Sequence, residues 1–312
     1  MITHVDGAMR FVARRLESAP SSFSAGFRAR WPGVLPIVRR LEVSPRVRVL
    51  TVGGATLGGS GKTPLAIACA KALREGGARV AFVGHGYRAH ARGPALVSPG
   101  DSSFGDEAEE AARALVPFGV MVFAAARRER AVELASTRAD VLVLDGPVNL
   151  EPRRADAALL AVDPEAPYGS GRCFPFGDLR AAPERLRAAV DRIVRVGAGE
   201  AAEARIVALR ARTLSGEESP VSSHRRVATG IARPGRFLEA VQAAGATIEL
   251  HLERPDHDVR PLPEGPWLVP AKNAHWAWGS GGRRARADVA WVEYDIDLPS
   301  SLRDFLNTRL LR

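Results

Sequence analysis

The residue types with the most specific chemistry form one short run, Thr56-Leu57-Gly58-Gly59-Ser60-Gly61-Lys62-Thr63. The run follows a strand-like segment and opens a helical pattern, which is the context that a phosphate-binding loop requires. Glycines let backbone N–H groups turn toward phosphate oxygens, and the helix start adds positive potential. Lys62 is then placed to reach the β- and γ-phosphates, and the Thr63 hydroxyl to reach Mg²⁺. The loop predicts binding of a nucleoside triphosphate with Mg²⁺, although Thr56 stands where the strict pattern has glycine.

Three further positions carry side chains that suit phosphoryl transfer. Asp145 ends the apolar run 141–144, where a P-loop enzyme has its second metal-side acid; the alternative is a turn aspartate. Asp106 and Glu107 precede a helical pattern, so capping of that helix explains them equally well. His257 lies in an expected loop, where a histidine without function is common. An acid and a histidine facing each other across a nucleotide cleft would deprotonate a hydroxyl nucleophile.

The elements that must position these residues alternate along the chain. We expect strands at 46–52, 79–83, 120–124, 140–144, 157–162 and 192–196, and helices at 63–77, 106–115 and 127–136. A second set follows, with strands at 227–231, 247–252, 267–270 and 289–294, and helices at 234–244 and 298–311. This alternation predicts an α/β fold, with a mainly parallel P-loop-type sheet covered by helices on both faces and a smaller C-terminal α/β lobe.

Four regions are expected from the composition along the chain. They are a basic amphipathic leader at 1–45, a P-loop core at 46–213, a polar linker at 214–224 and the C-terminal lobe at 225–312. Apolar stripes between arginines would let a partly helical leader lie on a membrane surface. An ordinary surface helix packed on the core is the alternative.

The overall composition excludes several classes of protein. The chain has 312 residues, 33.4 kDa and 46% hydrophobic residues, which is typical of a globular protein. Two cysteines are too few for a disulfide scaffold, and no apolar run is long enough to span a bilayer. A net charge of +9 suits phosphorylated or anionic partners, but it is also what a GC-rich genome would produce. Aromatic residues, at 6%, do not interleave with the arginines, so we expect no nucleic-acid partner.

At this point the residues resemble one family, the tetraacyldisaccharide 4'-kinases of lipid A biosynthesis. Several blocks carry the likeness in order: Thr56–Pro64, Gly84–Arg88, Phe104–Ala108, Tyr168–Leu186, Gly230–Phe237 and Pro255–His257. The resemblance implies a kinase that moves the γ-phosphoryl group of ATP to the 4'-hydroxyl of a tetraacyl glucosamine disaccharide 1-phosphate. It also implies a peripheral location on the cytoplasmic face of the bacterial inner membrane, with no specific protein partner.

The family's site residues carry over to matching positions of this chain. Lys62 and Thr63 would hold phosphates and Mg²⁺, with Glu107 and Asp145 on the metal side. Asp106, paired with His257, would be the base that accepts the proton of the sugar hydroxyl.

The chain departs from the family pattern in several places. His85 stands where the family usually has arginine, and His257 is followed by Asp258 instead of a second histidine. The family continues its strand-end acid with a second acid, a glutamine and a histidine, whereas this chain has Gly146-Pro147-Val148-Asn149 after Asp145. The family's Thr-Glu-Lys-Asp block is here Pro270-Ala271-Lys272-Asn273. These departures leave two alternatives open: a P-loop kinase with a different hydroxyl acceptor, or a weakened nucleotide-binding regulatory protein.

Overall fold

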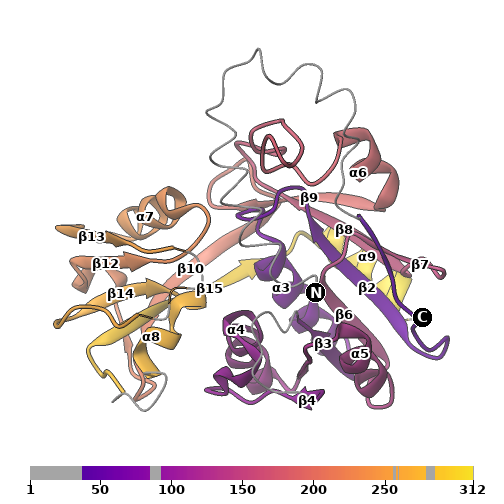
Figure 1. Ribbon diagram of the computed structural model, residues 1–312, viewed down its shortest axis with the longest axis horizontal. Helices are drawn as coiled ribbons and strands as arrows, with labels where there is room; N and C mark the ends of the chain where they lie inside the picture. The colour runs from indigo at the N-terminus through magenta and orange to yellow at the C-terminus, as the bar shows by residue number, and fades with distance from the viewer. Residues whose placement is uncertain (1–36, 85–92, 256–257, 259, 279–284, 312) are drawn as a thin grey trace.

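The computed structural model describes residues 37–84, 93–255, 258, 260–278 and 285–311 (Figure 1). A central sheet runs through both halves of the molecule in the order β13-β12-β14-β15-β10-β9-β8-β2-β6-β3-β5-β4. In the first half, strands β9, β8, β2, β6, β3 and β5 are parallel, and β4 adds an antiparallel edge. Their bounds are β2 Arg48–Gly54, β3 Val80–Val83, β4 Ala95–Leu96, β5 Met121–Ala124, β6 Val141–Gly146, β8 Ala157–Val162 and β9 Arg192–Gly197.

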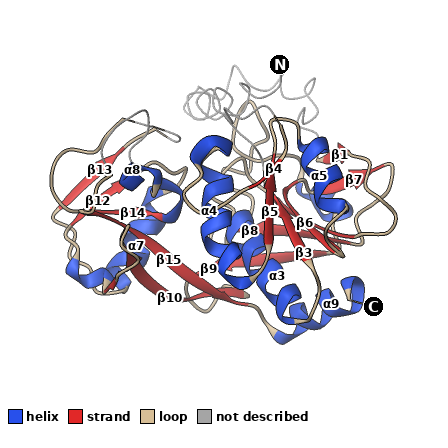
Figure 2. Ribbon diagram, turned by 90° about the horizontal axis from the view of Figure 1, so that it is seen from below, coloured by secondary structure: helices blue, strands red, loops and turns tan. Residues whose placement is uncertain are grey.

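Helices cover both faces of these parallel strands, as Figure 2 shows. Leu50 and Val52 of β2 face one layer, made by α3 (Lys62–Glu75), α4 (Asp106–Leu115) and α9 (Ser300–Leu310). Val49 faces the opposite layer, where α5 (Arg128–Ser136) packs; α6 (Pro183–Ala189) covers β8 on that side. Because both faces are buried, β3, β5, β6 and β8 are nearly continuous apolar runs, whereas β9, nearer the second half, includes the exposed Arg195. The predicted α/β fold with helices on both faces is confirmed.

The second half extends the same sheet. Parallel strands β12 (Arg226–Thr229), β13 (Leu250–Glu253), β14 (Trp267–Pro270) and β15 (Val289–Asp297) carry helices α7 (Pro234–Ala243) and α8 (His275–Trp278). The long strand β10 (Ala204–Arg212) pairs antiparallel with β15, and these two strands join the halves in Figure 1. Short 3₁₀ helices lie at η2 Ser102–Phe104, η3 Val116–Phe118, η4 Val221–Ser223 and η5 Ala271–Asn273.

Several segments differ from their expected form. The leader was expected to reach residue 45, but residues 38–40 form strand β1, which pairs with β7 (Asn149–Glu151). This segment is part of the fold because Ile37 and Leu41, on either side of β1, are buried against the core. Residues 1–36 lie outside the described residues. The segment expected as a linker, 214–224, contains strand β11 (Glu218–Ser219) and the buried Val221.

Strand β10 and the packing of the last helix were not expected. The apolar run of β10 is short, 206–209, and arginines flank it at 205, 210 and 212. Arg210 and Arg212 pair with acids of β15. Helix α9 follows the second half in sequence, but Leu302 and Leu306 pack with α3 of the first half.

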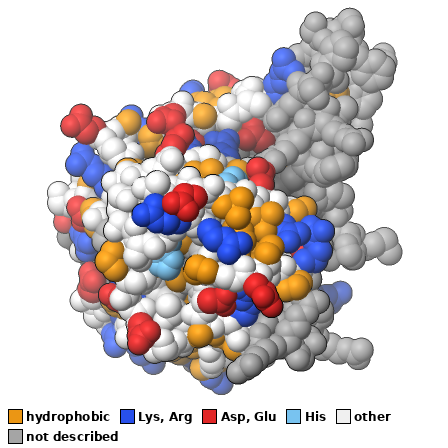
Figure 3. All heavy atoms as spheres, turned by 90° about the vertical axis from the view of Figure 1, so that its left-hand side faces the viewer, with side chains coloured by type: hydrophobic (Ala, Val, Ile, Leu, Met, Phe, Trp, Pro, Cys, Tyr) orange, Lys and Arg blue, Asp and Glu red, His pale blue; other side chains and the backbone are white. Residues whose placement is uncertain are grey.

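The surface carries mixed charge on the face shown in Figure 3, where basic, acidic and apolar side chains are interspersed over the second half. Within the described ranges, no helix has the length and apolar character needed to cross a bilayer.

Candidate active site

The glycine-rich run forms the turn between β2 and α3. Gly61, at φ 79°, has the left-handed conformation that glycine adopts without strain, and it precedes the first residue of α3. Among the described residues no side chain caps this helix start, so its N–H groups remain available for an anion. The hydroxyl of Thr56 donates a hydrogen bond of 2.7 Å to the Gly58 carbonyl oxygen, which closes the loop at the position where the strict pattern has glycine.

Three predicted residues meet at the start of α3. The Thr63 hydroxyl donates a 2.6 Å hydrogen bond to Asp145 Oδ2, and Lys62 Nζ lies 3.9 Å from Asp145 Oδ1. Asp145 is only 5% exposed, because β6 pairs with β2 directly beneath the loop. Its Oδ1 atom is buried and accepts no hydrogen bond from the described residues.

This arrangement fits Mg²⁺ bound together with a triphosphate. A buried carboxylate oxygen without a hydrogen-bond donor, beside a threonine hydroxyl, is the oxygen pair that the metal needs from a P-loop protein. In the described part of the chain, no three His, Cys, Asp or Glu side chains cluster as metal ligands. A magnesium ion that takes its remaining oxygens from phosphate and water does not require such a cluster.

Arg128 is a further candidate for this site, which the motifs of the sequence do not single out. It begins α5, it is only 7% exposed, and a Cβ atom at Gly146 would lie 3.3 Å from its Nη2 atom. Burial lowers the pKa of its guanidinium to about 10, against the opposing effect of Asp145 and, more weakly, Glu107. The sequence signal was an arginine at the start of a helix that follows a parallel strand, where ligand sites gather.

Asp106 and Glu107 are the first residues of α4, and they face the second half of the molecule. Lys272, in η5, places Nζ 3.7 Å from Glu107 Oε1 and 4.0 Å from Asp106 Oδ2. The Glu107 amide also donates a 3.0 Å hydrogen bond to Asp106 Oδ1, which orients that carboxylate. Acids in a first helical turn are stabilised by the helix dipole as well.

His257 lies outside the described residues, so the structure does not place it with Asp106. The next described residue, Asp258, is held by helix α8. Its carbonyl oxygen lies 3.0 Å from His275 Nε2 and 2.8 Å from Trp276 Nε1.

One further acid beside this group is strongly perturbed. Glu110, one turn along α4, is buried, and burial raises its pKa to about 7. Arg113 and Lys272 oppose that rise, whereas Glu107 and Asp106 add to it. The raised pKa of Glu110 is therefore caused by burial first, and the two neighbouring acids contribute less than the two cations oppose.

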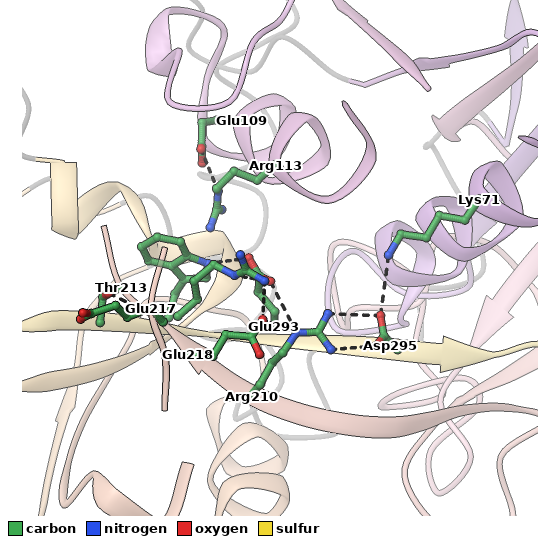
Figure 4. A network of polar contacts seen from close by, with 11 residues as sticks. Lys71, Glu109, Arg113, Arg210, Thr213, Glu217, Glu218, Glu293 and Asp295 are labelled. Atoms are coloured by element: carbon green, nitrogen blue, oxygen red, sulfur yellow. Dashed lines mark hydrogen bonds and ion pairs between the residues drawn. The ribbon is translucent and has the colours of Figure 1, made fainter. Parts of the chain in front are cut away.

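Polar contacts tie both site helices to the second half of the molecule: an ion pair joins α3 to β15, and a hydrogen bond joins α4 to η5. Figure 4 shows the ion pairs of this region. From α3, Lys71 Nζ lies 3.7 Å from Asp295 of β15, which in turn accepts a 2.7 Å hydrogen bond from Arg210 of β10. From α4, Arg113 pairs with Glu109 at 2.7 Å and donates a 2.8 Å hydrogen bond to the Ala271 carbonyl oxygen beside Lys272. The position of α4 is thereby coupled to that of η5.

Two of the departures from the family pattern have structural roles in this chain. Asn149 is buried; its Oδ1 accepts hydrogen bonds from the amides of Leu150 and Ala155, and its Nδ2 donates to the Ala189 carbonyl oxygen. Asn273 is fully buried and bonds both backbone groups of Gly230, accepting at 2.8 Å and donating at 3.3 Å. A carboxylate at position 273 could make only the first of these bonds.

Comparisons with known proteins find a family of relatives and a solved structure. Residues 36–259 match the sequence family described as Tetraacyldisaccharide-1-P 4'-kinase. The chain is 37% identical over 230 residues to a tetraacyldisaccharide 4'-kinase of Methylorubrum populi, an alignment that covers 70% of this chain and 69% of the relative. It is 34% identical over 239 residues to that of Methylorubrum extorquens, covering 74% and 72%.

A solved structure shares the fold. It is the "apo" form of LpxK from Aquifex aeolicus in complex with ATP, with a TM-score of 0.64 at 20% identity. The match covers 99% of this chain and 100% of that chain.

Proposed function

The chain belongs to the tetraacyldisaccharide-1-P 4'-kinase family, and from this premise we propose that it transfers the γ-phosphoryl group of ATP to the 4'-hydroxyl of a tetraacyl glucosamine disaccharide 1-phosphate. The observation that carries the proposal is the contact of Thr63, Asp145 and Lys62 at the start of α3. These three side chains come from two distant segments, and they meet at the N-terminus of α3, whose N–H groups, left uncapped by the described side chains, can bind phosphate oxygens.

Residues of the loop bind and orient the nucleotide. Backbone N–H groups of 58–63 surround the β- and γ-phosphates, and Lys62 supplies a cation to them. Thr63 and Asp145 would hold Mg²⁺, with Glu107 as a third candidate, and the bound ion would neutralise phosphate charge. Arg128 adds a buried positive charge beside Asp145, in surroundings where water screens it weakly.

Asp106 is the proposed general base, with His257 as its partner. The sugar oxygen forms a bond to the γ-phosphorus, the bond from that phosphorus to the β–γ bridging oxygen breaks, and ADP leaves. The hydroxyl proton passes to the Asp106 carboxylate. Lys272 stabilises the ionised form of this acid pair from the second half.

Incubation of the purified protein with γ-labelled ATP and the lipid acceptor tests the activity. We expect the wild-type protein to transfer label to the disaccharide. Lys62→Ala should lower the rate of this transfer by about 100-fold or more, because the phosphates lose their cation. Thermal unfolding of both proteins checks that the variant is folded. Transfer only to another hydroxyl compound would favour the alternative acceptor, and ATP binding without any transfer would favour the regulatory alternative.

We also propose peripheral attachment to the cytoplasmic face of the inner membrane, where the acylated acceptor resides. The net charge of +9 and the arginines of the leader support attraction to anionic lipid. Deletion of 1–36, which leaves strand β1 intact, reduces flotation with vesicles containing anionic phospholipid in low salt. Unchanged flotation would contradict a membrane role for the leader.

A further inference from the structure

An arginine of the second half contacts the phosphate loop of the first. Arg233 lies immediately before α7, and its guanidinium bonds two carboxylates of the first half. Nη1 donates a 2.6 Å hydrogen bond to Asp163 Oδ2, and Nη2 donates a 2.9 Å bond to Asp178 Oδ2. Asp163 follows β8 and has a side chain only 1% exposed, so its charge depends on protein partners.

The methylene groups of the same arginine lie over the loop itself. A Cβ atom added to Gly59 would fall 2.6 Å from Arg233 Cδ and 2.8 Å from Cγ. Gly59 also has φ 71°, a conformation that disfavours a side chain. The loop therefore has a glycine at the point where Arg233 approaches its backbone.

Asp178 holds the loop from the other side. Its carbonyl oxygen accepts a 2.8 Å hydrogen bond from the Leu57 amide, while the neighbouring Leu179 forms a β-bridge with Thr56. Burial alone would raise the pKa of the Asp178 carboxyl, but bonds from the Ser170 amide and Arg233 hold it below its usual range. One residue thus binds the loop through its backbone and Arg233 through its side chain.

We propose that Arg233 is a positioning residue for ATP, which holds the phosphate loop in its nucleotide-accepting form by docking the second half on Asp163, Asp178 and Gly59. This inference rests on the proposed function, since it names how that site is prepared. Loss of the contact leaves the loop to be ordered when nucleotide binds, so part of the binding free energy is spent on ordering.

The Asp163 carboxylate keeps a second cation when Arg233 is changed, because Arg236 of α7 also pairs with it. A substitution at 233 therefore does not leave a buried charge alone. This allows the loop effect to be separated from general unfolding.

The test compares Arg233→Ala, Arg233→Lys and Asp178→Asn with the control Arg225→Ala. Arg225 belongs to the same half, and its 2.8 Å pair with Glu249 is exposed, with side chains 59% and 60% accessible. Calorimetry measures ATP affinity, and kinetics separate KM for ATP from kcat. We expect Arg233→Ala to weaken ATP binding and raise its KM about tenfold, with kcat at saturating ATP changed less than about threefold.

Hydrogen exchange of the amides at 57–61 in nucleotide-free protein provides a second measurement, one that needs neither ATP nor lipid. Exchange there accelerates in Arg233→Ala, partly recovers in Arg233→Lys and is unchanged in Arg225→Ala. Normal ATP affinity together with unchanged loop exchange in Arg233→Ala, even with a lower melting temperature, overturns the inference. Failure of wild type to bind ATP would instead contradict the proposed function, while the exchange measurement still decides the role of Arg233.

Discussion

The Thr63 hydroxyl donates a 2.6 Å hydrogen bond to Asp145 Oδ2, although 82 positions separate the two residues. The contact follows from the register of the two strands, because Val52 of β2 pairs with Asp145 of β6. The loop after β2 leads directly into α3, which begins with Lys62 and Thr63. Two oxygen groups suited to a magnesium ion are therefore brought together by the parallel sheet and the helix that follows its central strand.

Replacement of Asp145 by asparagine tests this pair. The amide keeps the size of the side chain and can still accept the Thr63 hydrogen bond, but it removes the negative charge that suits Mg²⁺. We expect Asp145→Asn to lower kcat by about 100-fold or more and to raise the Mg²⁺ concentration needed for half-maximal rate. Asp140→Asn is the control, since its ion pair with Arg79 lies exposed at the start of the same strand. An Asp145 variant with normal magnesium dependence would remove this carboxylate from the metal side.

Lys272 offers a test of the acid pair on α4. Its ammonium lies within 4.0 Å of both Asp106 and Glu107, and a nearby cation favours the ionised form of a carboxylate. Lys272→Met should move the acidic limb of the kcat/KM profile to higher pH because the carboxylates lose a nearby cation, and Lys272→Arg should restore much of the wild-type profile. A uniform loss of rate at every pH, with no displacement of the limb, would speak against this role.

The raised pKa of Glu110 predicts that the stability of the folded protein depends on pH. Its pKa is about 7 in the folded protein because of burial, against an ordinary value of 4.5, so the folded state holds its proton more tightly than the unfolded state. The resulting stabilisation is complete below about pH 4.5 and is lost as pH rises through 7; the shift corresponds to about 3 kcal/mol.

Glu110→Gln, which stays neutral, should therefore gain stability relative to wild type as pH rises from 5 to 8. Urea unfolding across this range measures the difference, and the exposed Glu133→Gln on α5 is the control. Parallel stability curves for wild type and Glu110→Gln would show that burial does not raise this pKa.

Asn273 tests whether a departure from the family pattern is structural. Asn273→Asp loses the bond to the Gly230 carbonyl oxygen and places a carboxylate in a fully buried position. We expect it to lower the free energy of unfolding by about 1–3 kcal/mol at neutral pH. Asn307→Asp, on the exposed face of α9, is the matched control. Equal stability of the two variants would contradict the structural role of the Asn273 amide.

Local patterns of the sequence were enough to predict the phosphate loop, the alternating strands and helices, and Asp145 at a strand end. Each of these depends on neighbours within a few residues: glycines that permit positive φ, apolar runs buried on both faces, and an acid that ends such a run. The length of strand β10 could not be recognised in this way, because Arg210 and Arg212 at its end are stabilised by acids of β15 that lie 85 and 81 positions away.

Only the tertiary structure decided which distant charges meet. Arg128 looks like an ordinary arginine in the sequence. Lys272 and Arg233 stand in blocks that resemble the family's, but a charged side chain shows no local sign of its partner. The fold buries Arg128 beside Asp145, brings Lys272 to the start of α4 and lays Arg233 over Gly59. The contacts of Lys272 and Arg233 follow from how the sheet continues between the two halves, and that of Arg128 follows from the packing of α5 beside β6. No short stretch of residues encodes either arrangement.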